Sequence, residues 1–223
     1  NGKLLKQFGE IDNNSNQVKA NDPLNIPIAL PINTIGKYTL SVKYVLQPNI
    51  RYTTLYGLTE NRLFKASIVD LVIFQNSQSA YKVYYTGLEI FKIGLLFMLL
   101  ILHLSFYFLQ KNNKVHLLLA IFFLGSLLQY LFKISGQNQH WVETRYFDLN
   151  FSIWFSGIGG IFAITAFYQL AKVKLDIYYK MLILINFTGL IITSVKYGYI
   201  WATLSLVMAI MHIFLSLRLT RIG

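Results

Sequence analysis

Long runs of apolar residues without a charge fill most of the last 130 or so residues of the chain. A helix needs about 20 apolar residues to cross the hydrocarbon core of a bilayer. The runs predict membrane-spanning helices over about residues 88–110, 115–134, 149–171, 177–195 and 197–217. One such run would fit a buried helix of a soluble protein, but five in succession exclude a soluble domain. The pattern therefore predicts an α-helical membrane domain over residues 88–223.

A different pattern precedes these runs. Residues 38–46 alternate with period 2, with Leu40, Val42 and Tyr44 on one side, as is typical of a half-buried strand. Three further stretches read as strands: residues 24–30, 52–58 and 67–75. We therefore expect residues 1–80 to form part of an extracytoplasmic antiparallel β-sandwich of the jelly-roll kind.

Residues 81–87 separate the last predicted strand from the first predicted span. We expect this segment to be a short linker, in which Gly87 is the flexible point because glycine tolerates the widest range of backbone angles. Glu89 and Lys92 follow at a spacing of one helical turn, so we expect them to pair at the mouth of the first span.

The composition narrows the class of protein further. Hydrophobic residues make up 55% of the chain and charged residues 13%, and the net charge is +11. The basic residues sit in the loops between spans rather than on one compact face, so we do not expect nucleic acid as a partner. The chain has no cysteine, which excludes a disulfide or a thiolate metal site and leaves the redox compartment open.

Basic residues in the loops predict how the chain sits in the membrane, because cytoplasmic loops are enriched in lysine and arginine. Seven basic residues follow the first, third and fifth predicted spans, and three follow the second and fourth. The bias places residues 1–85 outside the cytoplasm and Gly223 inside it.

No catalytic constellation or cofactor motif stands out. The four histidines do not fall at the spacing of a helical metal site, and no cysteine or carboxylate cluster completes one. The acidic residues after Glu89 are Glu143, Asp148 and Asp176, and we expect all three in loops. A proton or ion pathway usually needs an acid inside a span, so this arrangement counts against a transporter.

Two features inside the spans have alternative interpretations. His103 lies deep in the first span, either as a proton sensor or ligand contact, or as a neutral imidazole hydrogen-bonded to a neighbouring helix; we favour the second. Ser152, Ser156 and Gly160 form a stripe of small residues at intervals of four, beside Gly157 and Gly159. Such stripes let membrane helices approach closely, so we favour packing over a flexible signalling hinge.

The predicted loop over residues 135–150 is the longest between spans. Its aromatic and polar residues could touch a ligand or the outer domain, although a plain interfacial loop is the favoured interpretation.

Several segments resemble a known family. The stretch LLILHLSFYFLQKNNKVHLLLAIFFLGSL, residues 99–127, resembles the first helical hairpin of the bacterial seven-transmembrane receptors with diverse intracellular signalling modules. Residues 25–32 and 36–44 resemble strands of the extracellular sandwich in Bacteroidetes-type sensor proteins. The resemblance implies seven spans, so we expect the chain to be a fragment truncated after the fifth. It also implies a cytoplasmic output domain, often a histidine kinase.

The leading hypothesis is a receptor in the bacterial inner membrane that relays an outside signal to a cytoplasmic output domain. The alternatives are a transporter or channel subunit and a membrane-embedded enzyme. The expected partners are the lipid bilayer, an extracytoplasmic ligand for which the resemblance suggests carbohydrate, and a second copy of the chain. We expect no cofactor, and the candidate signalling or packing residues are Gly87, His103, Ser152, Ser156 and Gly160.

Overall fold

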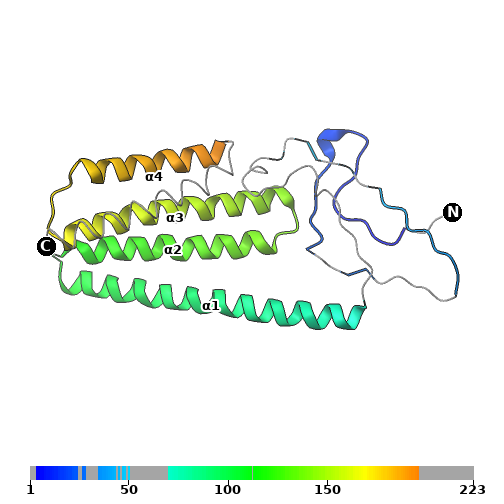
Figure 1. Ribbon diagram of the computed structural model, residues 1–223, viewed down its shortest axis with the longest axis horizontal. Helices are drawn as coiled ribbons and strands as arrows, with labels where there is room; N and C mark the ends of the chain where they lie inside the picture. Colours follow the sequence, from blue (N-terminus) through cyan, green and yellow to red (C-terminus); the bar gives the residue numbers. More distant parts are fainter. Residues whose placement is uncertain are drawn as a thin grey trace.

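The computed structural model of the chain describes residues 4–24, 27–28, 35–43, 45, 47–48, 50, 70–111 and 113–195. The helices in these residues are η1 (Ser15–Gln17, a 3₁₀ helix), α1 (Leu71–Leu109), α2 (Lys114–Asn138), α3 (Val142–Leu170) and α4 (Ile177–Val195). The four α-helices lie side by side, and the described part of the N-terminal region lies at one end of them (Figure 1).

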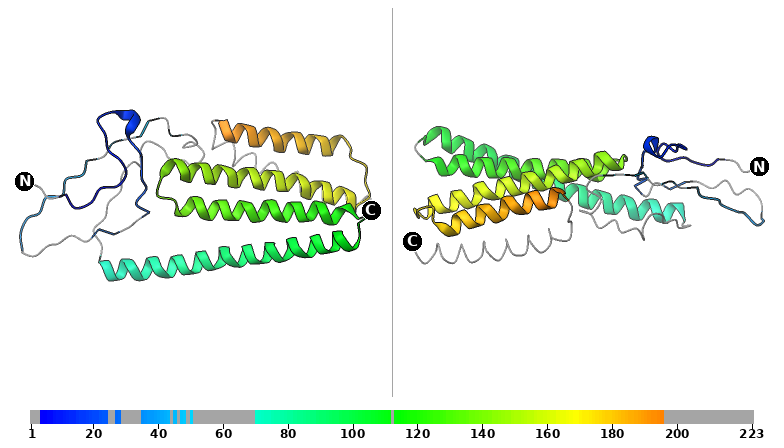
Figure 2. Two further views of the ribbon diagram at one scale, coloured as in Figure 1. Left: turned by 180° about the vertical axis from the view of Figure 1, so that it is seen from behind. Right: turned by 90° about the horizontal axis from the view of Figure 1, so that it is seen from above.

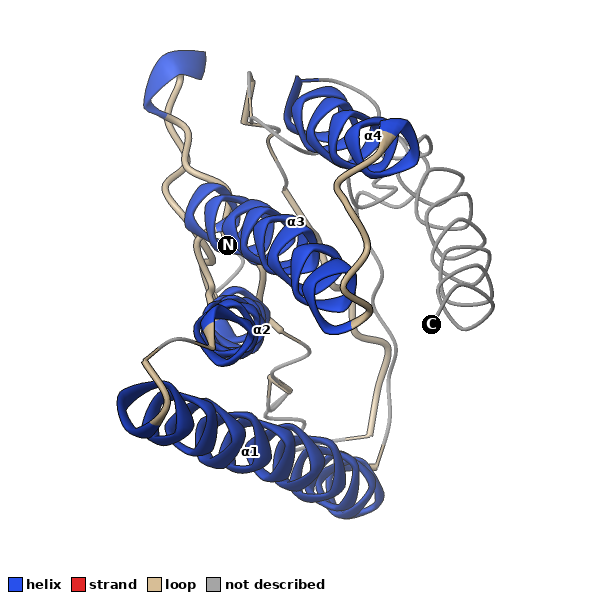
Figure 3. Ribbon diagram, turned by 90° about the vertical axis from the view of Figure 1, so that its left-hand side faces the viewer, coloured by secondary structure: helices blue, strands red, loops and turns tan. Residues whose placement is uncertain are grey.

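The helices pack in the order in which they follow one another. α2 and α3 share the most extensive interface, while α1 packs against α2 and α4 packs against α3. Seen along the helices, α1 and α4 lie on opposite sides of the α2–α3 pair (Figure 3). We call the end of the bundle that carries residues 139–141 the α2–α3 end. The opposite end, where Leu109 and Lys114 lie, is the α1–α2 end.

Three of the described helices are long and apolar enough to cross a membrane: Val72–Leu109, Lys114–Asn138 and Val142–Leu170. The apolar part of α4, Ile177–Ile191, is shorter, although the bounds of α4 agree with the fourth predicted span. The fifth predicted span, residues 197–217, lies outside the described residues. The described part is therefore helical and consistent with a multi-pass membrane protein.

α1 begins far before its apolar run. Its 39 residues correspond to about 58 Å at 1.5 Å per residue, against a hydrocarbon core of about 30 Å. The first turns of α1 extend past the ends of α2 and α3 (Figures 1 and 2). Residues 81–87, the predicted linker, are continuous helix within α1.

The predicted strand over residues 67–75 is also wrong where the structure describes it, because α1 starts at Leu71. The Asp70 carboxylate accepts hydrogen bonds from the backbone N–H groups of Val72 and Ile73, at 2.8 and 3.1 Å. An aspartate at this position satisfies N–H groups that have no partner within the helix. The cap favours a helix over the strand that the β-branched residues predicted.

No β-sandwich is found in the described residues. The predicted strands at residues 24–30 and 38–46 are irregular wherever they are described, and residues 52–58 lie outside that part. The bridges Glu10–Lys19 and Asn21–Trp141 are isolated pairs outside any strand. Residues 37–43 are exposed, and period-2 alternation does not produce a strand without a neighbouring strand to satisfy its backbone groups.

The long loop predicted over residues 135–150 is replaced by helix. α2 continues to Asn138 and α3 begins at Val142, so Glu143 and Asp148 lie in α3 rather than in a loop. Glu143 falls in the first turn of α3, where a negative charge interacts favourably with the helix dipole. Polar residues at both helix ends are therefore compatible with helix, although they interrupt the apolar runs.

Candidate functional site

The N-terminal region contacts the bundle at the α2–α3 end. We call residues 19–22 the docking segment. Within it, Asn21 forms an antiparallel bridge with Trp141 in the turn between α2 and α3. Two backbone hydrogen bonds flank the bridge, from the Asp22 N–H to the His140 carbonyl oxygen (2.8 Å) and from the Val142 N–H to the Ala20 carbonyl oxygen (3.2 Å). The docking segment is thereby fixed in register with the turn.

Side chains reinforce this backbone pairing. The Asp22 carboxylate forms an ion pair with the guanidinium of Arg145, in the first turns of α3. Nδ1 of His140 lies 3.1 Å from the carbonyl oxygen of Asp22, and since that oxygen can only accept, the ring nitrogen donates. On the other side of the segment, the Ala20 N–H donates to Oε1 of Gln47 at 2.6 Å. The docking segment therefore connects the N-terminal region to α3.

A polar contact between α2 and α3 lies close to this docking site in sequence. Oγ of Ser135 donates to Oδ2 of Asp148 at 2.6 Å, and Asp148 is buried. Asn150 is buried as well, and its Oδ1 has no hydrogen-bond partner in the described part of the chain. A Cβ on Gly136 would lie 3.1 Å from the carbonyl oxygen of Arg145. The backbones of α2 and α3 thus approach closely where the docking segment attaches.

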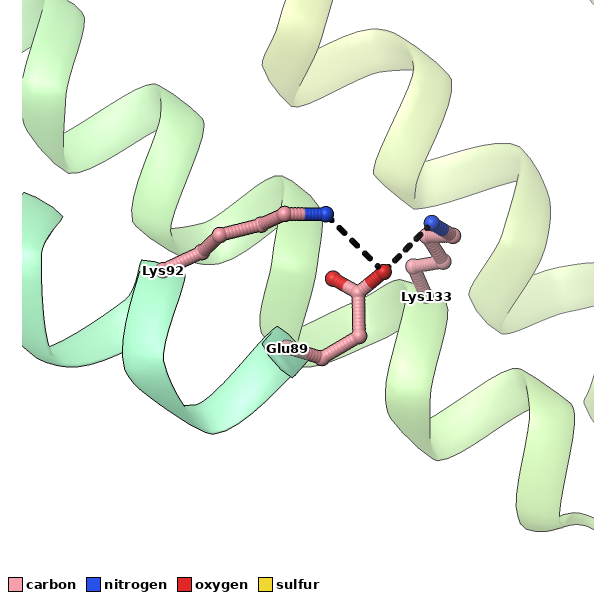
Figure 4. A network of polar contacts seen from close by, with 3 residues as sticks. All are labelled: Glu89, Lys92 and Lys133. Carbon is pink, nitrogen blue, oxygen red and sulfur yellow. Dashed lines mark hydrogen bonds and ion pairs between the residues drawn. The ribbon is translucent and has the colours of Figure 1, made fainter. Parts of the chain in front are cut away.

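A second polar cluster joins α1 to α2 near the same level (Figure 4). Oε1 of Glu89 accepts from Lys92 Nζ at 3.4 Å and from Lys133 Nζ at 3.3 Å, which confirms the predicted Glu89–Lys92 pair. Both ammonium groups lie over the ring of Tyr130, at 5.5 and 5.6 Å from its centroid, a geometry that favours cation–π attraction. The Glu89 side chain is 13% exposed. The cluster fixes the position of α1 along α2.

Toward the α1–α2 end, two histidines form the polar contact between α1 and α2. Nδ1 of His103 lies 3.1 Å from Nδ1 of His116 on α2, close enough for one ring to donate to the other. The His103 ring also stacks on Phe123, with centroids 5.3 Å apart, and Phe106 packs against His116. This contact agrees with the favoured interpretation of His103 as an imidazole that bonds to a neighbouring helix.

The other predicted site residues are dispersed. Gly87 lies inside the continuous helix α1 rather than at a hinge. A Cβ at this position would meet nothing within 4 Å. Ser152 is buried and donates to the carbonyl oxygen of Leu149 in its own helix. Ser156 is partly buried, and a Cβ on Gly160 would also meet nothing within 4 Å. The predicted stripe is therefore not the line of closest helix approach.

Neighbouring glycines make the close approaches instead. A Cβ on Gly125 of α2 would lie 3.1 Å from the Cα of Gly159 and 3.0 Å from the carbonyl oxygen of Phe155. A Cβ on Gly157 would lie 2.6 Å from the side chain of Leu190 on α4. Gly159 and Gly157 are thus the glycines at which α3 meets α2 and α4.

The turn between α3 and α4 has its own polar contacts. The hydroxyl of Tyr168, a fully buried residue, donates to Oδ1 of Asp176 at 3.0 Å. The same oxygen accepts the backbone N–H of Tyr179 at 3.0 Å. The Tyr179 hydroxyl lies 3.0 Å from Oγ1 of Thr165. These bonds couple the start of α4 to the last turns of α3.

Among the described residues, no group of three histidine or acidic side chains could hold a metal ion. The polar groups instead form contacts between elements: docking segment to α3, α2 to α3, and α1 to α2. Comparison with known protein families, with characterised proteins and with solved structures found no match for this chain. The candidate site is therefore defined by its geometry alone, as a set of couplings at the α2–α3 end.

The sequence held a signal for one of these couplings that the sequence analysis missed. Glu89 lies just before the first apolar run, and Lys133 lies just after the second. Since both runs contain 18 uncharged residues, a helical hairpin brings their ends to one level and the two charges together. The Asp22–Arg145 pair has no such signal, because 123 residues separate its members and no helix contains Asp22.

Proposed function

We propose that the chain is the sensor region of a membrane receptor, in which the N-terminal region passes a signal to the helical bundle through the docking segment. The observation that carries this proposal is the combined backbone and ion-pair contact of residues 19–22 with residues 140–145. A relay needs a physical contact whose two arrangements differ in free energy. The docking segment supplies such a contact between the N-terminal region, which lies outside the apolar runs, and the start of α3.

The resemblance to the bacterial receptors with diverse intracellular signalling modules supports the remainder of the proposal. It implies that the protein lies in the bacterial inner membrane, that residues 1–85 face away from the cytoplasm and that an output domain, often a histidine kinase, acts on the cytoplasmic side. Carbohydrate is the ligand class that the resemblance suggests. A reporter fused after Gly223 tests the orientation: a fluorescent protein should be active there, and alkaline phosphatase should not.

The transporter alternative gains little from Glu89 and Asp148, two acids that lie in helices with little of their surface exposed. Glu89 precedes the first apolar run by four residues, and Asp148 directly precedes the third. Both therefore lie at the rim of the apolar bundle, whereas a conducting acid usually lies near the bilayer midplane.

An ion-pair exchange tests the relay. In the full-length protein in membranes, Asp22→Arg and Arg145→Asp should each change basal autophosphorylation, and the double exchange should restore it. Allosteric couplings typically amount to about 5–150-fold, so we expect at least about a fivefold change for each single variant. The matched control is Asp12→Arg, which makes the same exchange at an exposed residue of the N-terminal region outside the docking segment.

The control variant Asp12→Arg should leave the output unchanged. If the Asp22 and Arg145 variants behave like this control, the docking contact carries no signal and the receptor proposal loses its support. If each single variant alters output but the double exchange fails to restore it, the pair itself is not the coupling element.

A further inference from the structure

We infer that the turn between α1 and α2 carries a binding site for the phosphate headgroup of an anionic phospholipid. A cleft of about 650 Å³ lies at this turn, within the range of ligand pockets, about 300–1,000 Å³. It is lined by Phe108, Leu109, Gln110, Lys111 and Asn113. The inference does not rest on the receptor proposal, because the turn lies at the rim of the apolar bundle in either orientation.

Unpaired basic side chains gather at this end of the bundle. The α1–α2 turn and the α3–α4 turn both lie there (Figures 1 and 3). The lysines of the two turns and of the first turns of α2 and α4 are exposed: Lys111, Lys114, Lys172, Lys174 and Lys180. Within the described residues, none of these five ammonium groups forms an ion pair. At the opposite rim, by contrast, Lys92, Lys133 and Arg145 all pair with acids.

One acid lies at the α1–α2 end among the described residues. Oδ1 of Asp176 accepts from the Tyr168 hydroxyl and from the Tyr179 backbone N–H, both at 3.0 Å. Five lysines against this one aspartate leave a formal charge of +4. A surface of one sign that no neighbouring acid offsets attracts anions to it.

The length of the apolar run places these lysines at the level of the lipid phosphates. Eighteen uncharged residues separate Lys92 from Lys111. They form about 27 Å of helix, and the hydrocarbon core of a bilayer is about 30 Å thick. Since the cluster of Glu89 with Lys92 lies at one rim, Lys111 lies at the other. Lys114 directly precedes the second apolar run, so it lies at the same level as Lys111.

The cleft has an apolar side and a polar side. Phe108 and Leu109 are 66% and 79% exposed and belong to the end of the apolar run, while Lys111 and Asn113 follow the run. A phospholipid has the same division, with acyl chains in the hydrocarbon core and a phosphate above them. A lysine side chain extends along apolar surface and places its ammonium group at the interface. The cleft therefore matches both parts of one lipid molecule.

The apolar side favours a lipid over an acidic segment of another protein. In a membrane, Phe108 and Leu109 lie deeper than Lys111, among the acyl chains. A peptide segment that entered at this depth would leave its backbone groups without hydrogen-bond partners, whereas a phospholipid already places its chains there. Basic pockets beside membrane helices bind anionic headgroups for this reason.

The α3–α4 turn separates a defined site from a general attraction between basic loops and anionic lipid. Lys172 and Lys174 are exposed at the same end of the bundle, but neither lines the cleft. A general attraction depends on all the lysines of this end alike. A site at the cleft depends on Lys111 and its neighbour Lys114.

Native mass spectrometry of the full chain in detergent tests the inference. The chain is titrated with phosphatidylglycerol and, in parallel, with phosphatidylcholine of the same acyl chains. The first phosphatidylglycerol should bind at least about fivefold more tightly, since one lysine near an anionic headgroup contributes about that factor. Lys111→Gln with Lys114→Gln should remove this preference. Lys172→Gln with Lys174→Gln is the matched control, which removes the same charge from the same end and should keep the preference.

A second pair of variants tests the apolar side of the cleft. Phe108→Ser should weaken the binding of phosphatidylglycerol several-fold, because an acyl chain loses its contact. Phe167→Ser, at a 52% exposed position near the end of α3, should leave it unchanged. All the substituted side chains are exposed, so each variant should keep the melting temperature of the unmodified chain.

Four results would each overturn the inference. The first is equal affinity for the two lipids, and the second is an equal loss from the two lysine pairs, which would indicate general attraction. The third is a Phe108→Ser variant that binds like Phe167→Ser. The fourth is displacement of phosphatidylglycerol by an equal concentration of inorganic phosphate, which would show that the turn binds free anions rather than lipid.

Discussion

Gly125 is the position at which one methyl group should most clearly disturb the bundle. In a Gly125→Ala variant, Cβ would lie 3.0 Å from the carbonyl oxygen of Phe155 and 3.1 Å from the Cα of Gly159. Both neighbours are backbone atoms of α3, which cannot move away as a flexible side chain can. Overpacking of this kind costs about 1–3 kcal/mol, while replacing a helical glycine by alanine returns about 0.5–1 kcal/mol.

Gly160→Ala is the matched control, because it places the same methyl group on α3 where nothing lies within 4 Å. It should show only the favourable helix effect. The two variants should therefore differ by about 1–3 kcal/mol, which corresponds to about 2–12 °C in melting temperature for a chain of this size. The measurement is the thermal loss of monodisperse protein in detergent, followed by size-exclusion chromatography of a fluorescent fusion.

The reasoning fails if Gly125→Ala melts at or above the temperature of Gly160→Ala. A Gly160→Ala variant that melts below the unmodified chain would show that the predicted stripe of small residues is the packing line.

Four further substitutions at three positions test the polar contacts, by the same melting assay at Glu89 and Tyr168 and by accumulation in the membrane at His103. Glu89→Gln leaves two ammonium groups without their anion and should cost about 1.5–3 kcal/mol; an unchanged melting temperature would mean that water satisfies these lysines. His103→Gln should accumulate in the membrane because an amide can still bond to His116, whereas His103→Lys should accumulate poorly, since a fixed charge deep in a span costs about 2.5–3.5 kcal/mol; equal accumulation would place this position in water. Tyr168→Phe removes the hydroxyl that donates to Asp176 and should cost about 1.5–3 kcal/mol; a melting temperature like that of the unmodified chain would show that this bond is not stabilising.

The sequence predicted the helices well where the apolar runs are continuous, and poorly at their ends. The fourth predicted span has the bounds of α4, and the second lies wholly within α2. Burial in lipid requires every backbone group to bond within its own segment, so a long apolar run permits little besides helix. Beyond the run, helix and irregular chain compete more evenly, and local features such as the Asp70 cap decide between them.

The predicted strands failed for a complementary reason. Period-2 alternation reports which residues could share one face of a sheet, but a strand forms only when a neighbouring segment accepts and donates its backbone hydrogen bonds. The described residues of segment 38–46 are not part of a strand. By contrast, Asn21 pairs with Trp141 without any alternating pattern, because the turn between α2 and α3 presents free backbone groups to it.

The small residues of α3 illustrate what a single helix pattern cannot resolve. Ser152, Ser156 and Gly160 lie on one face, and Gly157 and Gly159 lie close by on others. Each of these faces would permit a close approach, and the choice depends on which neighbour supplies a matching gap. Gly125 supplies it for Gly159, and this match could be recognised only by comparing two glycines 34 residues apart in the sequence.

The last turns of α2 form polar contacts with both neighbouring helices, α1 and α3. Lys133 bonds to α1 and Ser135 bonds to α3, two residues apart on the same helix. His140 follows within two residues of the end of α2 and accepts the backbone bond of the docking segment. Because a helix end moves as one body, a displacement of residues 19–22 would shift the α1 and α3 contacts together rather than one after the other. α2 is thus the element through which a movement of the N-terminal region would reach both neighbouring helices.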